Sequence, residues 1–426
     1  MNRTLLLKVL SRTRGGRLVL VDRGQRIELG EPSGISVEVR VLDRRAYGMV
    51  LRSGSTGMAD SYAAGMWQCD DLVGLVRLAA RNMAPLDALR RRFAPVLIPG
   101  QRFGALVRRS TPARARRDIA AHYDLSNELF ALFLDETMMY SCALFERPGM
   151  TLREAQEAKL DSICRKLGLG PADHVLEIGT GWGGFAIHAA THYGCRVTTT
   201  TISEAQRIEA QARVDAAGLS DRITILDQDY RELTGRWHKM VSIEMIEAVG
   251  WRNLPVYLRT CGALLADDGL FCLQAITIDD RAYEVEKGTR SFANTRIFPG
   301  GFVPAQTPLL TLTAQHTPMR AVHLEEIGPH YATTLRRWAE NFGAVPLAEL
   351  ERLGFDEPFQ RMWRFYLAYM EAGFAERRIG DIHLMLAGPA FRGEAALLAR
   401  ASAAGRSPSA AVEAAGDEVE QQRRAA

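Results

Sequence analysis

Four glycines in the segment HVLEIGTGWGGFAIHAA, residues 174–190, form the stretch of this chain best suited to binding a ligand. An apolar run that ends at Glu177 precedes them, and they open a predicted helix: Gly179, Gly181, Gly183 and Gly184. A strand that turns this tightly into a helix leaves backbone N–H groups exposed, and glycine lets a ligand approach them closely. Because such turns are common, the motif alone is a weak indication of function.

Two further apolar runs end in polar residues at the spacing of βαβ units. The run 195–200 ends in TISEAQ, residues 201–206, and the run 223–226 ends in DQDY, residues 227–230. The carboxyl ends of parallel strands meet at one edge of a sheet, so these segments predict a crevice for an adenosine-type ligand. A dinucleotide site carries a lone acid at the second strand end, where this chain has TISEAQ. We therefore predict S-adenosylmethionine (SAM) as the ligand, not NAD.

The alternation of strands and helices places these motifs in an α/β fold. Strands are predicted at 174–178, 195–200, 223–226, 240–245 and 270–276, with helices between them. This pattern is typical of a doubly wound, mostly parallel sheet, as in the Rossmann-like class I SAM-dependent methyltransferases. Helices at 331–342 and 356–378 and a last strand near 381–387 complete the predicted core.

Composition and motif order divide the 426 residues into four parts. We predict a smaller α+β domain at 1–95, associated with lipid or membrane, with strands at 17–21, 35–42 and 49–52 and a helix at 72–81. The other parts are a basic linker at 96–116, a methyltransferase domain at 117–392 with an insertion at 280–320, and a tail rich in alanine and charged residues at 393–426.

Charge and cysteine usage indicate the cellular location and the binding partners to expect. The stretch 81–117 is rich in arginine with interleaved apolar residues, and it is either a solvated linker or a surface for anionic lipid. No nucleic-acid-binding module accompanies it. The six cysteines are scattered and predict neither a metal site nor disulfides, and the N-terminal MNRTLLLKVL reads as an amphipathic helix, not a secretory signal. We expect a cytoplasmic protein that is peripheral on the inner face of the membrane.

Several motifs in order along the chain give it a family resemblance. The chain resembles the cyclopropane-fatty-acyl-phospholipid synthases, SAM-dependent enzymes that methylate acyl-chain double bonds, up to about residue 390. The matching segments are HYDLSNE at 122–128, MYSCALF at 139–145, EIGTGWG at 177–183, TISEAQ at 201–206, SIEMIEAVG at 242–250, IFPGG at 297–301 and HYATTL at 330–335. Residues 59–72 also look like the amino-terminal domain of the bacterial phospholipid enzymes.

The resemblance implies two binding sites. The cofactor site would contain Tyr140, Ser141, Glu177, Gly179, Gly181, Trp182, Gly183, Thr201, Ser203, Gln206, Asp229 and Tyr230. The second site would hold a bicarbonate ion that acts as the general base. Its ligands would be the backbones of Cys142 and Ile276 and the side chains of Glu247, Tyr331 and Gln274. No metal is implied.

The chain departs from the family in the bicarbonate pocket. Gln274 stands where these synthases usually carry histidine, Glu244 where they carry a small residue, and Ala248 where histidine follows the glutamate. Glu244 adds a carboxylate beside Glu247, so at least one of these carboxyls should have a raised pKa and hold a proton. The alternative is that strand alternation turns Glu244 out of the pocket, opposite Glu247.

An alkene is a poor nucleophile, so the methyl donor must be held in line with it and water must be excluded. Aromatic faces that could stabilise the cations are Tyr123, Tyr140, Phe145 and Trp182. A core role explains Tyr123 and Phe145 equally well, and it is less attractive for Trp182, which lies inside the glycine turn. Loss of a proton from the added methyl closes a cyclopropane. A prior hydride shift leads instead to a methylene, which a reductase would convert to a methyl branch. We expect the methylene product, because an ionised Glu244 would prolong the cation, with ring closure as the alternative.

Two other functions remain open from the sequence. One is a methyltransferase that acts on an O or N atom of a soluble metabolite, and the other is a non-catalytic lipid-binding protein with a decayed pocket. A phospholipid with an unsaturated acyl chain and an anionic membrane surface are the expected partners. A reductase partner and a homodimer are left open.

Overall fold

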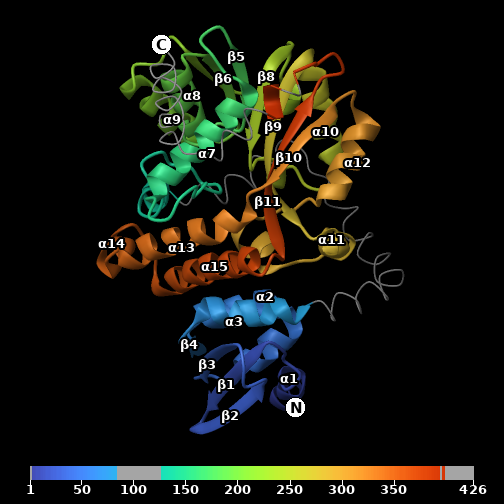
Figure 1. The fold of residues 1–426 in the computed structure, drawn as a ribbon. Coiled ribbons are helices and arrows are strands. Elements are labelled where there is room, and N and C mark those ends of the chain that lie inside the picture. Colours follow the sequence, from blue (N-terminus) through green and yellow to red (C-terminus); the bar gives the residue numbers. More distant parts are fainter. Residues whose placement is uncertain (1, 84–125, 394–395, 399–426) are drawn as a thin grey trace, which may run out of the picture.

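The fold is described from a computed structural model, which describes residues 2–83, 126–393 and 396–398 (Figure 1). Most of the arginine-rich stretch, Tyr123 and the first residues of the 122–128 motif lie outside the described residues. Two sheets organise the remainder, a seven-stranded sheet in the larger domain and a four-stranded sheet near the N-terminus.

The larger sheet has the strand order β10-β11-β9-β8-β5-β6-β7. Strands β5 to β9 pair in parallel, and β11 and β10 add antiparallel at one edge. Their bounds are β5 His174–Ile178, β6 Arg196–Thr201, β7 Ile223–Asp227, β8 Trp237–Ile243, β9 Leu265–Ile278, β10 Arg320–Glu326 and β11 Ile379–Ala387. The predicted doubly wound, mostly parallel sheet is confirmed.

Helices cover both faces of this sheet because its central strands are apolar on both sides. In β5, Val175 packs with helices α7, α8 and α9, whereas Leu176 and Ile178 pack with α10 and α12 on the opposite face. The bounds are α7 Leu152–Leu167, α8 Gly184–Tyr193, α9 Glu204–Ala216, α10 Leu254–Leu264 and α12 Gln306–His316. Helix α7 begins with a capping box of Thr151 and Glu154.

The region predicted as an insertion, 280–320, contains three short helices. They are α11 Asp280–Glu286, a π-helix at Ala293–Ile297 and α12, and residue 320 already begins β10. Three helices then connect β10 to β11: α13 Gly328–Ala344, α14 Leu347–Arg352 and α15 Glu357–Ala375. The two long helices agree with the predictions at 331–342 and 356–378. A short helix, α6 Asn127–Ala131, precedes the core.

The N-terminal domain packs a four-stranded sheet, ordered β2-β1-β3-β4, against helices. Its elements are α1 Asn2–Leu10, β1 Gly16–Asp22, β2 Gln25–Gly30, β3 Ile35–Val41, α2 Arg45–Ala63, β4 Trp67–Cys69 and α3 Leu72–Arg81. The predicted strand at 49–52 is wrong, because these residues lie inside α2. Helix α2 kinks at Gly54, whose φ of 53° is left-handed.

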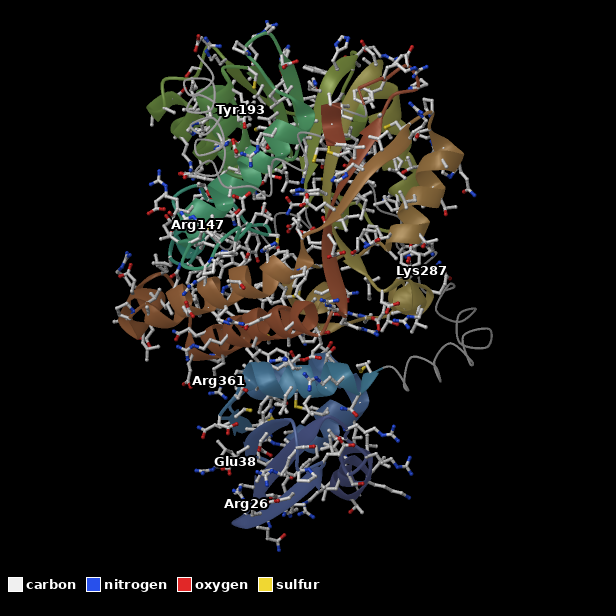
Figure 2. The ribbon with its side chains drawn as sticks, in the orientation of Figure 1. Arg26, Glu38, Arg147, Tyr193, Lys287 and Arg361 are labelled. Atoms are coloured by element: carbon white, nitrogen blue, oxygen red, sulfur yellow. The ribbon has the colours of Figure 1, made fainter. Side chains whose placement is uncertain are left out.

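The N-terminal domain lies directly beneath α15, with α2 and α3 against that helix (Figure 1). Arg361 of α15 donates hydrogen bonds to the carbonyls of Tyr62 (2.7 Å) and Trp67 (3.0 Å) at this junction (Figure 2). One continuous apolar cluster contains Trp67 from the small domain and Trp363 from α15. Among the described residues, no helix is both long enough and apolar enough to cross a bilayer.

Candidate active site

A crevice opens at the carboxyl ends of β5, β6, β7 and β8, where the sequence predicts the cofactor. Residues from each strand end and from the loop before α7 line it. The predicted residues among them are Tyr140, Ser141, Glu177, Gly179, Gly181, Trp182, Thr201, Gln206, Asp229 and Tyr230. Gly183 and Ser203 do not line the crevice; they are the N-caps of α8 and α9, and the Ser203 hydroxyl accepts the Gln206 N–H. Further lining residues, which the sequence did not single out, include Met138, Arg231, Met245 and Asn253, whereas Thr180, Ile202 and Gln228 belong to the predicted turn and loops.

The glycine turn leaves room for a ligand at one point. Gly179, Gly181 and Gly183 have φ values of 104°, 52° and 85°, which disfavour any other residue. A side chain at Gly179 would meet Met245, whereas a side chain at Gly181 would project into open space. The backbone next to Gly181 is therefore accessible from the crevice, as a nucleoside-type ligand requires.

Glu177 presents a buried, unsatisfied oxygen to the crevice. Its Oε2 atom has no hydrogen-bond partner among the described residues, and burial raises the pKa of this carboxyl to about 8. Nearby, Asp229 accepts two hydrogen bonds from the Arg231 guanidinium, at 2.8 and 2.6 Å. An unpaired acceptor, a glycine turn and an open crevice together fit SAM, which offers amino and hydroxyl donors.

A second group of polar residues surrounds Glu244 at the inner end of the crevice. Glu244 Oε1 accepts hydrogen bonds from the Cys142 backbone N–H and the Gln274 side-chain amide, both at 2.8 Å. Its Oε2 accepts from the Tyr331 hydroxyl at 2.6 Å. Burial raises the pKa of Glu244, and the Tyr331 and Cys142 hydrogen bonds oppose that shift. The suggestion that Glu244 faces away from the pocket is wrong.

The backbone explains why Glu244 turns inward. Strand β8 ends at Ile243, and Glu244 has a φ of 49°, in the left-handed region that non-glycine residues rarely adopt. Strand alternation therefore stops before Glu244. Its N–H is held by the Gln274 carbonyl at 3.0 Å. Backbone strain of this kind is concentrated at functional sites.

Glu247 lies on the 3₁₀ turn Ile246–Ala248 that follows. Its Oε1 accepts the Ile276 backbone N–H at 2.6 Å, while its Oε2 is buried with no partner among the described residues. Burial, together with the negative charge of Glu244, raises the pKa of Glu247 to about 8. The loop after the π-helix closes over this turn, since the Phe302 N–H donates to the Glu247 carbonyl at 3.0 Å.

A buried polar chain runs from Gln274 to the surface. The Gln274 amide also donates to Asp381 Oδ2 at 2.9 Å, and its carbonyl oxygen pairs with His383 Nε2 at 3.2 Å. His383 Nδ1 pairs with the Lys166 ammonium at 2.7 Å, and Lys166 reaches the partly exposed Glu325. Sequence reasoning missed Asp381, although an acid and a histidine at alternate positions of an apolar strand, IGDIHLMLA, were a usable signal.

Aromatic rings form one wall of the site. Tyr331 stacks on Phe374 at 4.3 Å, and the Tyr140 hydroxyl is 2.6 Å from that of Tyr366. The Trp182 ring packs against Phe130 in the core, and its N–H donates to Asn127 Oδ1 at 2.8 Å, which favours a packing role for that ring. Phe145 is partly buried against the same cluster.

One buried ammonium lies between the two sites. Lys159 of α7 donates to the Ser141 hydroxyl at 2.8 Å, and Ser141 lines the crevice. Burial lowers the pKa of Lys159 to about 8, opposed by the negative charge of Glu244. Cys142 supplies its N–H to Glu244 while burial raises the pKa of its thiol, so a nucleophilic role is disfavoured.

The strand order, the strand-end crevice and the glycine turn define a class I SAM-dependent methyltransferase. The mycolic acid cyclopropane synthetase family model matches residues 110–384, and the chain belongs to this family. The resemblance inferred from the sequence is therefore confirmed.

Individual relatives agree with this assignment. The chain is 41% identical to the tuberculostearic acid methyltransferase UfaA1 of Mycobacterium tuberculosis, over 76% of each chain. It is 35% identical to the cyclopropane-fatty-acyl-phospholipid synthase of Escherichia coli K12, over 83% of this chain and 90% of that protein. The crystal structure of mycolic acid cyclopropane synthase CmaA1 with SAH and CTAB superposes with a TM-score of 0.59 at 30% identity, covering 64% of this chain and 98% of CmaA1.

Proposed function

We propose that the protein methylates a cis double bond in the acyl chain of a phospholipid, with SAM as methyl donor and the Glu244 carboxylate as base. The relative named as a cyclopropane-fatty-acyl-phospholipid synthase supports this substrate class. The enclosed carboxylates at the inner end of the crevice support carbon methylation. Carbon methylation needs a base fixed inside the site, because the carbocation must lose a carbon-bound proton after methyl transfer.

One observation carries this proposal: carboxylates of the chain itself accept from the hydrogen-bond donors that the family resemblance assigns to bicarbonate. The Cys142 N–H and the Tyr331 hydroxyl donate to Glu244, and the Ile276 N–H donates to Glu247. Because these donors are already paired with carboxylates of the chain, the Glu244 carboxylate replaces the bicarbonate that the family resemblance implied.

The residues around the crevice prepare the reaction. When bound in the crevice, SAM would supply an electrophilic methyl group. The glycine turn seats the ligand, and Lys159 fixes Ser141 at the crevice wall. The Tyr140 and Tyr366 hydroxyls are hydrogen-bonded to each other. Together with the surrounding rings, they exclude water from the carbocation that forms on the acyl chain.

The fixed position of the base favours a methylene product. Glu244 is held from the loop before α7, from β9 and from α13, so it cannot follow the substrate. An ionised carboxylate beside the cation prolongs its lifetime, and a hydride can then shift from the methylated carbon to the neighbouring cationic carbon. Loss of a methyl proton to Glu244 yields a methylene group (C=CH2) on the acyl chain. Ring closure without the hydride shift is the alternative outcome.

Replacing Glu244 by glutamine tests the base. Glu244→Gln keeps the shape and the hydrogen-bond acceptor but accepts no proton, so turnover should fall by about 100-fold or more while SAM binding by calorimetry persists. Turnover of the parent in carbonate-free buffer should equal turnover with added bicarbonate. Full activity in Glu244→Gln, or a requirement for bicarbonate, would contradict this assignment.

Product analysis tests the outcome of the reaction. Vesicles of a monounsaturated phospholipid are incubated with enzyme and SAM, and the acyl chains are examined by mass spectrometry and NMR. We expect methylene-bearing chains, which a reductase would convert to methyl branches. Cyclopropane as the sole product would replace the methylene assignment while leaving Glu244 as the base.

Helix α1 supports a peripheral membrane location, as expected for an enzyme whose substrate is a phospholipid. Leu5 and Val9, four residues apart on α1, are 54% and 51% exposed, and no residue of α1 is buried. Sedimentation with vesicles tests this: we expect binding to anionic vesicles and less to neutral ones. A double Leu5→Gln/Val9→Gln variant should sediment less, and equal sedimentation would remove α1 from the membrane contact.

A further inference from the structure

Asp381 is a buried carboxyl that neither the family motifs nor the proposed chemistry uses. It lies on β11 between β9 and β10, and its side chain is fully buried. A charged group at such a position needs compensation, because burying an isolated carboxylate costs several kcal/mol. It shares a hydrogen-bonding partner, Gln274, with the proposed base, Glu244.

One amide connects the two carboxyls. Gln274 Nε2 donates to Glu244 Oε1 at 2.8 Å and to Asp381 Oδ2 at 2.9 Å, which uses both of its hydrogens. The orientation of this amide is fixed from the other side. Lys166 donates to His383 Nδ1, so His383 Nε2 carries the hydrogen and donates to the Gln274 carbonyl.

The donors are divided unequally between the two acids. Glu244 receives three hydrogen bonds, from Cys142, Gln274 and Tyr331, whereas Asp381 receives one side-chain hydrogen bond at Oδ2. Asp381 Oδ1 is buried with no partner among the described residues, while the single Gln274 amide holds Asp381 and Glu244 close together. Two ionised carboxylates at this spacing repel, and because both are acceptors only, a hydrogen bond between them requires a proton on one of them.

We propose that Asp381 is a positioning residue that keeps this proton and donates it from Oδ1 to Glu244, leaving Glu244 as the ionised member of the pair. The inference rests on Glu244 being the base. During turnover the substrate proton passes to Glu244, the pair then holds two protons, and it releases one to solvent before the next cycle.

The surroundings favour a neutral Asp381. Burial and the negative charge of Glu244 raise the pKa of Asp381 well above its usual range. The titratable or charged groups that face it come from six elements or loops: Glu244, Glu247, Cys142, Lys159, Tyr331 and, at its backbone N–H, Glu326. Lys159 provides one positive charge against three nearby carboxyls, which is too little to keep all of them ionised.

The pH dependence of kcat/KM distinguishes the protonation states of Asp381. Asp381→Asn presents an amide N–H where the proton would be, so the acid limb should stay where it is in the parent. Asp381→Leu removes the donor, so the acid limb should move up by about one pH unit and turnover should fall further than in the asparagine variant. If Asp381 were ionised, Asp381→Asn would remove a like charge and move the limb down, which would overturn the proposal.

An infrared measurement tests the proton without turnover. The difference spectrum between the parent and Asp381→Asn at pH 7 should contain the C=O stretch of a protonated carboxyl. A carboxylate signal in its place would overturn the proposal even if Glu244→Gln is inactive. Conversely, a fully active Glu244→Gln variant would remove Glu244 as the base while the protonated-carboxyl signal still reported on Asp381. The two assignments can therefore fail separately.

Discussion

The surroundings of Glu244 are assembled from several distant parts of the chain. Its left-handed backbone brings the carboxylate to the Cys142 N–H and the Tyr331 hydroxyl. These donors come from segments far apart in the chain, so they lower the pKa of Glu244 only when the whole fold is assembled. Their effect opposes the rise that burial causes.

Replacing Tyr331 by phenylalanine should therefore change the pH profile as well as the rate. A hydrogen bond to a charged group contributes about 1.5–3 kcal/mol, so its loss should raise the pKa of Glu244. Because the proposed base must be ionised, the acid limb of kcat/KM should move up by about one pH unit or more. Tyr47→Phe is the matched control, since it removes a buried hydroxyl–carboxylate bond to Asp22 in the N-terminal domain. An unshifted limb in Tyr331→Phe would show that the hydroxyl does not act on the base.

Sequence reasoning reached part of this site. Glu247 and Tyr331 lie in family motifs, and the substitutions at Glu244 and Gln274 were visible because they interrupt those motifs. The left-handed φ of Glu244 was not visible, because a strand pattern gives no sign of where the strand stops. Asp381 was missed because its side-chain partner, Gln274, lies 107 residues away in the chain, on β9.

At the scale of elements, α15 joins the N-terminal domain to the active site. One side of the helix carries Tyr366 and Phe374, which contact Tyr140 and Tyr331. Arg361 reaches the small domain, where its guanidinium lies 4.4 Å from the Tyr62 ring centroid and donates to two backbone carbonyls. The N-terminal domain thus supports the helix that positions the aromatic wall.

Arg361→Met should loosen this junction. Two charge-assisted hydrogen bonds are lost, each of about 1.5–3 kcal/mol, while most of the side-chain volume remains. We expect a lower Tm and faster proteolytic release of the N-terminal domain. Arg364→Met, an exposed arginine on the same helix, is the control and should leave both measurements near those of the parent. Equal behaviour of the two variants would show that Arg361 does not hold the domains together.

The elements themselves were predicted unevenly. Strands β5 to β9, α13, α15 and β11 were anticipated because their periodicity is regular. The run 49–52, MVLR, favours a strand because it is short and mostly apolar, yet it belongs to a helix whose buried face includes Tyr47 and Ala59. Strand β10 was missed because an edge strand with exposed charges, RAVHLEE, resembles a loop.

At the scale of the whole molecule, the site contains several buried acidic side chains. Glu177, Glu244, Glu247 and Asp381 all have raised pKa values, chiefly through burial. Lys159 and Lys166 are the fully buried ammonium groups among the described residues. The fold therefore tolerates these acids best while most of them hold protons, and its stability should depend on pH.

The free energy of unfolding should fall between pH 6.5 and 8. Glu177 and Glu247 have pKa values of about 8 in the native protein and about 4.5 when unfolded, so the native state binds more protons throughout this interval. Each such carboxyl lowers stability by about 1.4 kcal/mol per pH unit. The buried histidines do not reverse this trend, because burial lowers the pKa values of His188 and His383 and both are neutral above pH 6.5.

Tm measured by calorimetry should therefore be lower at pH 8 than at pH 6.5. Glu247→Gln removes the ionisation, so its Tm should decline less steeply and exceed that of the parent at pH 8, although turnover should fall. Glu340→Gln, at a half-exposed position on α13, should keep the slope of the parent. A parent Tm that rises from pH 6.5 to 8 would contradict the raised pKa values. A Glu247→Gln variant whose Tm does not change with pH would assign the loss of stability above pH 6.5 to Glu247, the carboxyl that accepts the Ile276 N–H.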